Sequence, residues 1–79
     1  MKVSLIHIYL TKKLIEECGE LEDTLERSRV VRRICLARIP IKCEGKIIDE
    51  LEDIGFIEIV DKKNIKVNKK EFEKYTSYF

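Results

Sequence analysis

Apolar residues in the first quarter of the chain recur every three or four positions, which is the spacing of one face of an α-helix. They are Leu10, Leu14, Ile15, Cys18 and Leu21, with Lys12, Lys13, Glu16 and Glu17 between them. The Val, Ile and Tyr residues at positions 3–9 also suit a strand, so this stretch leaves both structures open. We favour one amphipathic helix that begins at about residue 4 and ends near Gly19.

The next apolar positions predict a second helix with two unlike faces. Asp23 and Glu26 have the spacing of a capping box, which places the start of this helix at about residue 23. We expect it to end at about Ala37, because Pro40 disfavours helical backbone in the residue before it. One side then carries Val30, Val31 and Ile34, and the opposite side carries Arg29, Arg32 and Arg33.

A third helix and a β-hairpin are predicted after Pro40. Apolar residues at 47, 48, 51 and 54 indicate a helix over about Cys43 to Ile54, and Gly55 suits the left-handed residue that ends it. Strand-forming residues at 56–60 and 65–67, separated by a polar turn at 61–64, indicate the hairpin. The exposed side of the third helix would carry Lys46, Asp49, Glu52 and Asp53.

The chain closes with an aromatic segment. Asn68 and the residues after it have the pattern of a helix start, which leads into the aromatic positions. These are Phe72, Tyr75, Tyr78 and Phe79. The rings either cover the core of their own chain or pack against a second copy, with disorder as a third alternative.

The order of these elements resembles that of a winged helix, in which a helix-turn-helix is followed by a hairpin wing. Ile47 to Glu58 looks like the end of a recognition helix and the first wing strand, and Arg38 to Lys42 looks like the turn before that helix. The resemblance covers roughly residues 5–68. It implies an α+β fold, mostly α, as a single domain over residues 1–79, with a core at about 4–68 and a C-terminal helix at about 69–79.

The resemblance also implies double-stranded DNA as the partner, as in small regulators of archaea and archaeal viruses. The third helix would enter the major groove and the hairpin would lie along phosphates, as in a sequence-specific or general DNA-binding protein that acts as a transcriptional regulator. The DNA-facing residues would be Arg29, Arg32, Arg33, Lys42, Gly45, Lys46, Lys62, Lys63 and Lys66, on one continuous face. A homodimer would read two half-sites, joined by the first helix or by Phe72, Tyr75, Tyr78 and Phe79.

Charge divides the chain into four blocks, although the net charge is only +1. Residues 27–46 carry seven cations against one acid and residues 61–79 carry six against three, whereas 1–26 and 47–60 are acidic. The blocks predict two basic patches separated by an acidic one, unless they neutralise each other as surface salt bridges. The acidic third helix leaves a second function open, in which the domain docks or inhibits a protein partner.

Other classes of function find little support in the residues. A single histidine, His7, and scattered carboxylates form no acid–base pair and no phosphate-binding glycine loop, so we expect neither an enzyme nor a cofactor. Cys18, Cys35 and Cys43 match no zinc spacing, which leaves buried thiols or one disulfide. No apolar run approaches the roughly 18 residues of a membrane span, so we expect no membrane contact and a cytoplasmic protein.

The composition adds one indication about the source. Lys and Glu number 11 each, whereas Gln is absent and Asn occurs twice. Proteins that stay folded at high temperature show this enrichment in Lys and Glu together with few thermolabile amides. We therefore expect a thermophilic source.

Overall fold

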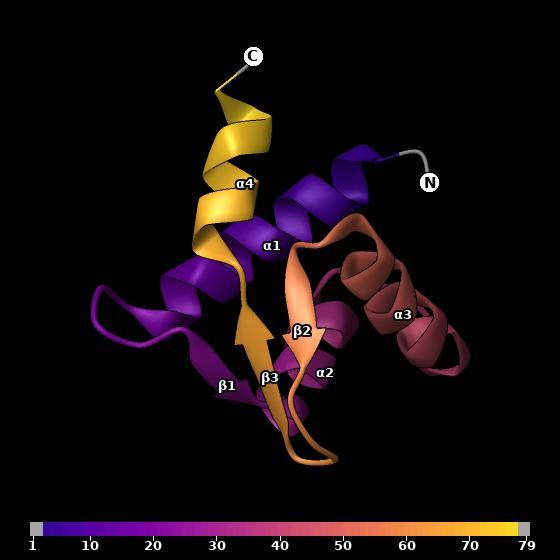
Figure 1. Ribbon diagram of the computed structural model, residues 1–79. Coiled ribbons are helices and arrows are strands. Elements are labelled where there is room, and N and C mark those ends of the chain that lie inside the picture. Colours follow the sequence, from indigo (N-terminus) through magenta and orange to yellow (C-terminus); the bar gives the residue numbers. More distant parts are fainter. Residues whose placement is uncertain (1–2, 78–79) are drawn as a thin grey trace.

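Four α-helices, one 3-10 turn and three β-strands make up residues 3–77, which are the residues that the computed structural model describes (Figure 1). In chain order they are α1 (Leu5–Cys18), β1 (Thr24–Glu26), α2 (Arg27–Leu36), the 3-10 turn η1 (Ile41–Cys43), α3 (Glu44–Ile54), β2 (Ile57–Ile59), β3 (Asn64–Val67) and α4 (Lys69–Thr76). The predicted α+β class, mostly helical, is confirmed. The first, third and last helices and the hairpin also lie where the sequence predicted them.

Helix α1 begins after Ser4, and His7 in its first turn contacts α3. The backbone N–H of Ser4 donates to Nδ1 of His7 over 3.0 Å, and Nε2 of the same ring lies 3.4 Å from Oε1 of Glu50. Because Nδ1 accepts a hydrogen bond, the ring proton is on Nε2 and points at the Glu50 carboxylate. His7 is only 4% exposed, so this contact ties α1 to α3 inside the protein.

The three strands form one antiparallel sheet in the order β1-β3-β2, with β3 in the middle. Leu25 of β1 lies opposite Ile65 of β3, and Ile65 lies opposite Ile59 of β2. Alternate residues point inward, so Leu25 and Ile65 are buried. The outward side of the sheet carries Thr24, Lys66 and Glu58, which are neighbours across the strands.

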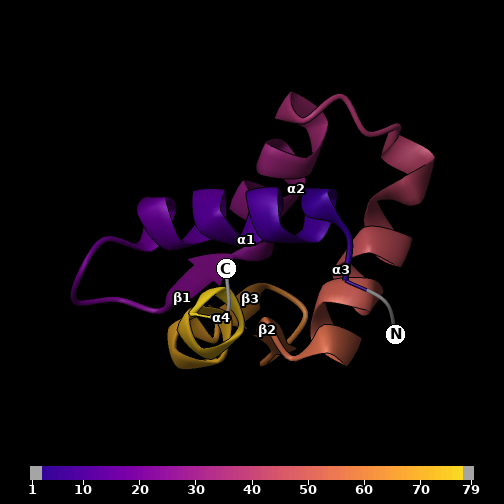
Figure 2. The same ribbon diagram turned by 90° about the horizontal axis from the view of Figure 1, so that it is seen from above.

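The core lies between the inward side of the sheet and the helices. In Figure 2, α1 lies between α2 and the sheet with α4, and α3 stands beside the N-terminal half of α1. The fully buried side chains come from α1, α2, α3, the hairpin strands and Phe56 before β2, so these helices and the sheet share one core. Its largest members are Phe56, Leu10, Leu14, Ile34, Ile48, Leu51, Ile57 and Ile65.

Residues 24–26 form strand β1, whereas the sequence predicted a helix from residue 23. The backbone N–H of Val67 donates to the carbonyl of Asp23 over 2.6 Å, and Leu25 is buried against the sheet. The capping-box pattern spans only four residues, and pairing with β3 supplies hydrogen bonds along the whole segment. Helix α2 therefore begins at Arg27, later than predicted, and ends at Leu36, close to the predicted end.

Helix α4 packs onto the core through its aromatic side chains. Phe72 is buried, and its ring meets that of Phe56 edge-on at a centroid distance of 5.3 Å. The ring of Tyr75 contacts the same Phe56 at 5.6 Å. Phe72 therefore covers the core of its own chain, as one of the alternatives predicted. Because its ring is buried, it is not exposed for the predicted contact with a second copy. Tyr78 and Phe79 lie outside the described residues.

Two glycines at opposite ends of α3 allow a matched test of the helix boundaries. Gly55 ends the helix with a φ of 97°, a left-handed conformation, whereas Gly45 lies in the first turn; a Cβ added at either meets no atom within 4 Å. We expect Gly55→Ala to lower the free energy of unfolding by about 1 kcal/mol, and Gly45→Ala to raise it by up to about 1 kcal/mol. Urea unfolding measures both changes, and a loss of stability in Gly45→Ala would contradict the start of α3.

Candidate nucleic-acid interface

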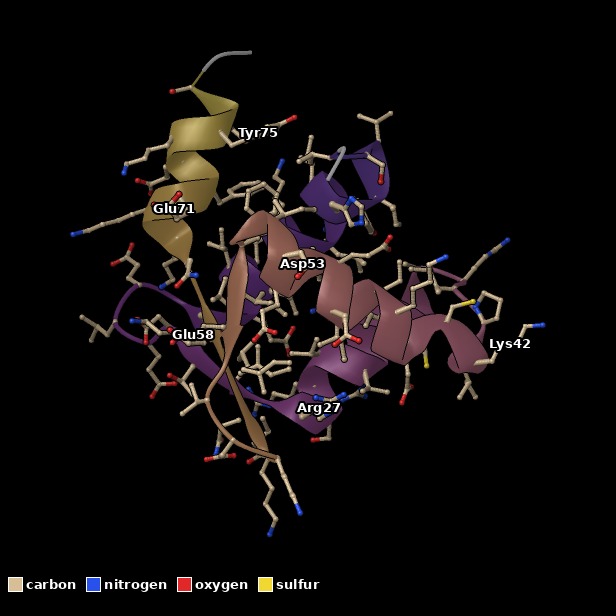
Figure 3. All side chains as sticks on the ribbon, turned by 45° about the vertical axis from the view of Figure 1, so that its right-hand side comes forward. Arg27, Lys42, Asp53, Glu58, Glu71 and Tyr75 are labelled. Atoms are coloured by element: carbon tan, nitrogen blue, oxygen red, sulfur yellow. The ribbon has the colours of Figure 1, made fainter. Side chains whose placement is uncertain are left out.

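An open groove lies between the start of α2, the turn between β2 and β3, and the start of α3. Its volume is about 720 Å³, and its lining residues are Glu26, Arg27, Ser28, Val31, Glu44, Lys62, Lys63 and Asn64. We call it the hairpin groove. Figure 3 shows Arg27 below α3, on the side of that helix toward the tip of the hairpin.

The β2–β3 turn is held in shape by Asp61. Its Oδ1 accepts the backbone N–H groups of Lys63 and Asn64 over 2.7 and 2.8 Å. These hydrogen bonds, that from Lys63 foremost, hold the pKa of the Asp61 carboxyl below its usual value. The backbone N–H of Arg27 donates to the carbonyl of Lys63 over 2.7 Å, which fixes the turn against α2. Arg27, Lys62 and Lys63 therefore extend from one hydrogen-bonded region.

The three cations of the hairpin groove form no ion pair with another residue in the described part of the chain. The Lys and Arg ion pairs found there are Arg33–Glu17, Lys13–Glu16 and Lys74–Glu71. Two carboxylates, Glu26 and Glu44, line the same groove and reduce its positive charge. Glu44 lies in the first turn of α3, where the helix dipole favours a negative side chain. An anion in the groove could therefore bind Arg27, Lys62 or Lys63, but it would also lie near Glu26 and Glu44.

Arg29, Arg32 and Arg33, the α2 arginines predicted to face DNA, do not line the hairpin groove. Arg33 donates from Nε to Oε2 of Glu17 on α1 over 2.8 Å. The hydrogen bond from Arg33, with charge contributions from all three arginines, holds the pKa of Glu17 below its usual value. The α2 residues that line the groove are Arg27, Ser28 and Val31; helical geometry turns Arg29 and Arg33 away from them, and Arg32 lies one turn beyond Ser28 without lining the groove. The expectation of one continuous basic face is therefore corrected.

Arg27 is the cation of the groove that sequence reasoning misses. A helix that began at residue 23 would contain Arg27 in its second turn. In the structure Arg27 is the first residue of α2, and its backbone contacts the hairpin. Thr24 is the one residue of 24–26 that favours a strand, which is too weak a signal to place the start of α2 at Arg27.

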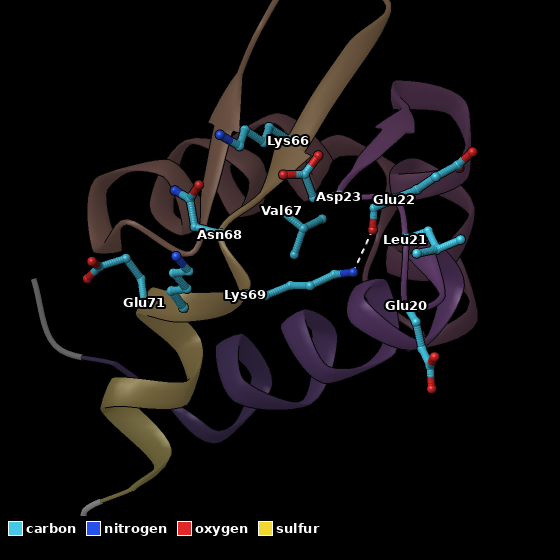
Figure 4. Close-up of a pocket in the computed structure, with 10 residues that line it drawn as sticks. Glu20, Leu21, Glu22, Asp23, Lys66, Val67, Asn68, Lys69 and Glu71 are labelled. Carbon is cyan, nitrogen blue, oxygen red and sulfur yellow. Dashed lines mark hydrogen bonds between the residues drawn. The ribbon is translucent and has the colours of Figure 1, made fainter.

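Lys66 is separated from the other hairpin lysines. It lies within β3 on the outward side of the sheet, opposite Glu58, because alternate strand residues point to opposite faces. It lines a second open depression of about 550 Å³ (Figure 4). There the Nζ of Lys69 donates to the carbonyls of Gly19 and Glu22 over 2.6 and 2.5 Å, which ties α4 to the α1–β1 loop.

Helix α3 has a basic start and an acidic outward side. Lys42 in η1 and Lys46 in the first turns of α3 are exposed, and Gly45 is half-buried between them. Further along, the exposed residues Asp49 and Asp53 lie four positions apart on one side of the helix. Figure 3 shows Lys42 at one end of α3 and Asp53 near the other. Only the start of α3 is therefore suited to phosphate.

No protein-family model, curated protein or solved structure matches the chain. Over residues 3–77 no helix is long and apolar enough to cross a membrane, and no three His, Cys, Asp or Glu side chains gather into a group suited to a metal ion. Cys18, Cys35 and Cys43 are free thiols.

The Arg33–Glu17 contact makes stability depend on pH. Because the pKa of Glu17 is lowered in the folded chain, the contact stabilises the fold above the ordinary pKa of 4.5 and is lost as the pH falls through the folded value. We expect Glu17→Gln to lower the urea midpoint at neutral pH, with the difference from the wild type vanishing in strong acid. Glu16→Gln, whose partner Lys13 is 3.4 Å away on the surface, serves as the control and should change less. An equal loss in Glu17→Gln at both pH values would contradict this assignment.

Proposed function

We propose that this chain is a winged-helix protein that binds double-stranded DNA and acts as a transcriptional regulator. The order of the elements supports the proposal, because α1, α2 and α3 are followed by the β2–β3 hairpin. The short strand β1 adds a third strand beside the hairpin. In this arrangement α2 and α3 form the helix-turn-helix and the hairpin forms the wing.

The observation that carries the proposal is the hydrogen bond from the backbone N–H of Arg27 to the carbonyl of Lys63, at 2.7 Å. It holds the start of α2 against the hairpin, so that Arg27, Lys62 and Lys63 line one groove. Lysine and arginine side chains that approach a duplex neutralise its phosphates and release bound counterions. Two further cations are exposed at the start of α3, Lys42 before Glu44 and Lys46 after it.

We also propose a homodimer formed through α1. Leu5 is 84% exposed and Tyr9 is 49% exposed, and the two lie one helical turn apart on the outer side of that helix. Phe72 of α4 is buried in its own chain, whereas Leu5 and Tyr9 of α1 are open to a second copy. A two-fold pair would present two hairpin grooves to one duplex.

A second function, the docking of a protein partner, is favoured by the outward side of α3. Asp49 and Asp53 are exposed, and among the described residues no lysine or arginine lies within 4.0 Å of either carboxylate. A protein with a basic surface would complement these charges. This function gains support over DNA binding if the chain binds no duplex and forms a stable complex with a purified basic protein.

Fluorescence anisotropy with a random duplex tests DNA binding. The affinity should fall about tenfold or more between roughly 50 and 200 mM salt, because each phosphate contact releases counterions. The Lys62→Ala/Lys63→Ala variant should bind more weakly, and the slope of log affinity against log salt should become shallower by about 1–2. Lys66→Ala/Lys70→Ala removes the same charge beside the other depression and is the matched control. An affinity that is independent of salt would contradict the proposal.

Light scattering tests the homodimer. We expect a mass of about twice that of the 9.4 kDa chain. Leu5→Glu should reduce the mass to that of one chain, because it would bring two carboxylates together at the two-fold contact. Leu21→Glu, at a side chain that is 100% exposed in the α1–β1 loop, is the control and should leave the dimer intact. A wild-type protein that remains monomeric at high concentration would contradict the α1 interface.

A further inference from the structure

We infer that the hairpin groove holds a duplex by its phosphate backbone while α3 stays out of the major groove, so that binding does not depend on base sequence. This inference rests on the proposed DNA binding, and it departs from the major-groove role that the winged-helix resemblance implies for α3. Two surfaces carry it, the outward side of α3 and the outer rim of the hairpin groove.

The outward side of α3, where a recognition helix would touch the bases, carries Asp49 and Asp53 against the single cation Lys46, so acids outnumber cations there. Asp49 and Asp53 are both exposed, and no lysine or arginine of the described chain lies within 4.0 Å to neutralise them. In the major groove these carboxylates would lie between two rows of phosphates. Most hydrogen-bonding atoms on the base edges there are acceptors, since only the amino groups of cytosine and adenine donate. Repulsion and the loss of hydration therefore both oppose insertion of α3.

Contacts on both flanks of α3 hold this acidic side outward. Glu50 lies 3.4 Å from Nε2 of His7 on α1, and Glu52 accepts the backbone N–H of Ile59 on β2 over 3.0 Å. The two contacts lie on different sides of the helix, and together they fix its rotation about its own axis. Asp49 and Asp53 consequently stay on the outward side, and α3 cannot turn a less acidic side toward DNA without breaking them.

The hairpin groove offers a phosphate the opposite chemistry. Lys62 and Lys63 are exposed at its edge, and Arg27 is half-buried behind them. Glu26, which is exposed, and Glu44, which is half-buried, also line the groove and would repel a phosphate that comes close to them. A DNA strand would therefore follow the hairpin turn, where Lys62 and Lys63 are exposed, and keep away from the two carboxylates. Contacts of this kind go to the sugar–phosphate backbone and carry no information about the bases.

A matched pair of charge variants distinguishes backbone binding from major-groove binding. Asp49→Asn/Asp53→Asn removes two charges from α3, and Glu20→Gln/Glu22→Gln removes two from the α1–β1 loop, where both residues are exposed beside the depression that Lys66 lines. We expect both variants to raise the affinity for a random duplex by a similar factor, about twofold or less, at roughly 0.15 M salt, where the Debye length is about 8 Å. A selection from a random duplex library should enrich no sequence motif.

The outcomes separate this inference from the proposed function. An increase of about tenfold or more in Asp49→Asn/Asp53→Asn alone, or an enriched motif, overturns the inference and leaves DNA binding in place. A wild-type chain that binds no duplex even at low salt overturns the proposed function and the inference together. Small and equal increases without a motif confirm that α3 stays outside the major groove. Circular dichroism of each variant verifies that these surface substitutions leave the fold unchanged.

Discussion

The pairing of β1 with β3 is the contact on which the arrangement of the surface depends. It buries Leu25 against Ile65, and backbone hydrogen bonds continue beyond the ends of β1, from Val67 to Asp23 and from Arg27 to Lys63. The chain therefore passes from strand directly into α2, whose first residue adjoins the hairpin turn. Without this short strand the start of α2 and the hairpin would be separate surfaces, and no groove would lie between them.

Secondary-structure geometry then divides the cations among different surfaces. Helical rotation turns Arg33 toward Glu17 on α1 while Arg27 lines the hairpin groove. Strand alternation places Lys66 on the outward side of the sheet, whereas Lys63 lies in the turn. A chain with a net charge of +1 thus presents several small basic areas. Binding of a polyanion depends on which cations share a surface, and the total charge does not reveal this.

The acidic composition of α3 has two physical origins. Glu50 and Glu52 serve the fold, because one contacts His7 and the other accepts a backbone N–H from β2. Asp49 and Asp53 make no such contact with the described residues 3–77 and remain exposed. Glu50 and Glu52 orient the helix, and this orientation turns Asp49 and Asp53 outward. The same sequence segment that resembles a recognition helix consequently carries a side that disfavours contact with DNA.

The sequence by itself determined the helices, the hairpin and the acidic character of α3, because these follow from local periodicity and from single residues such as Gly55. The aromatic C-terminal helix was also predictable, although its two packing alternatives were not resolved until Phe72 was seen against Phe56. Only the tertiary structure decided that residues 24–26 form a strand and that Arg27 joins the hairpin lysines. The partner of Leu25 is Ile65, far along the chain, and pairing between such distant segments leaves little trace in a local pattern.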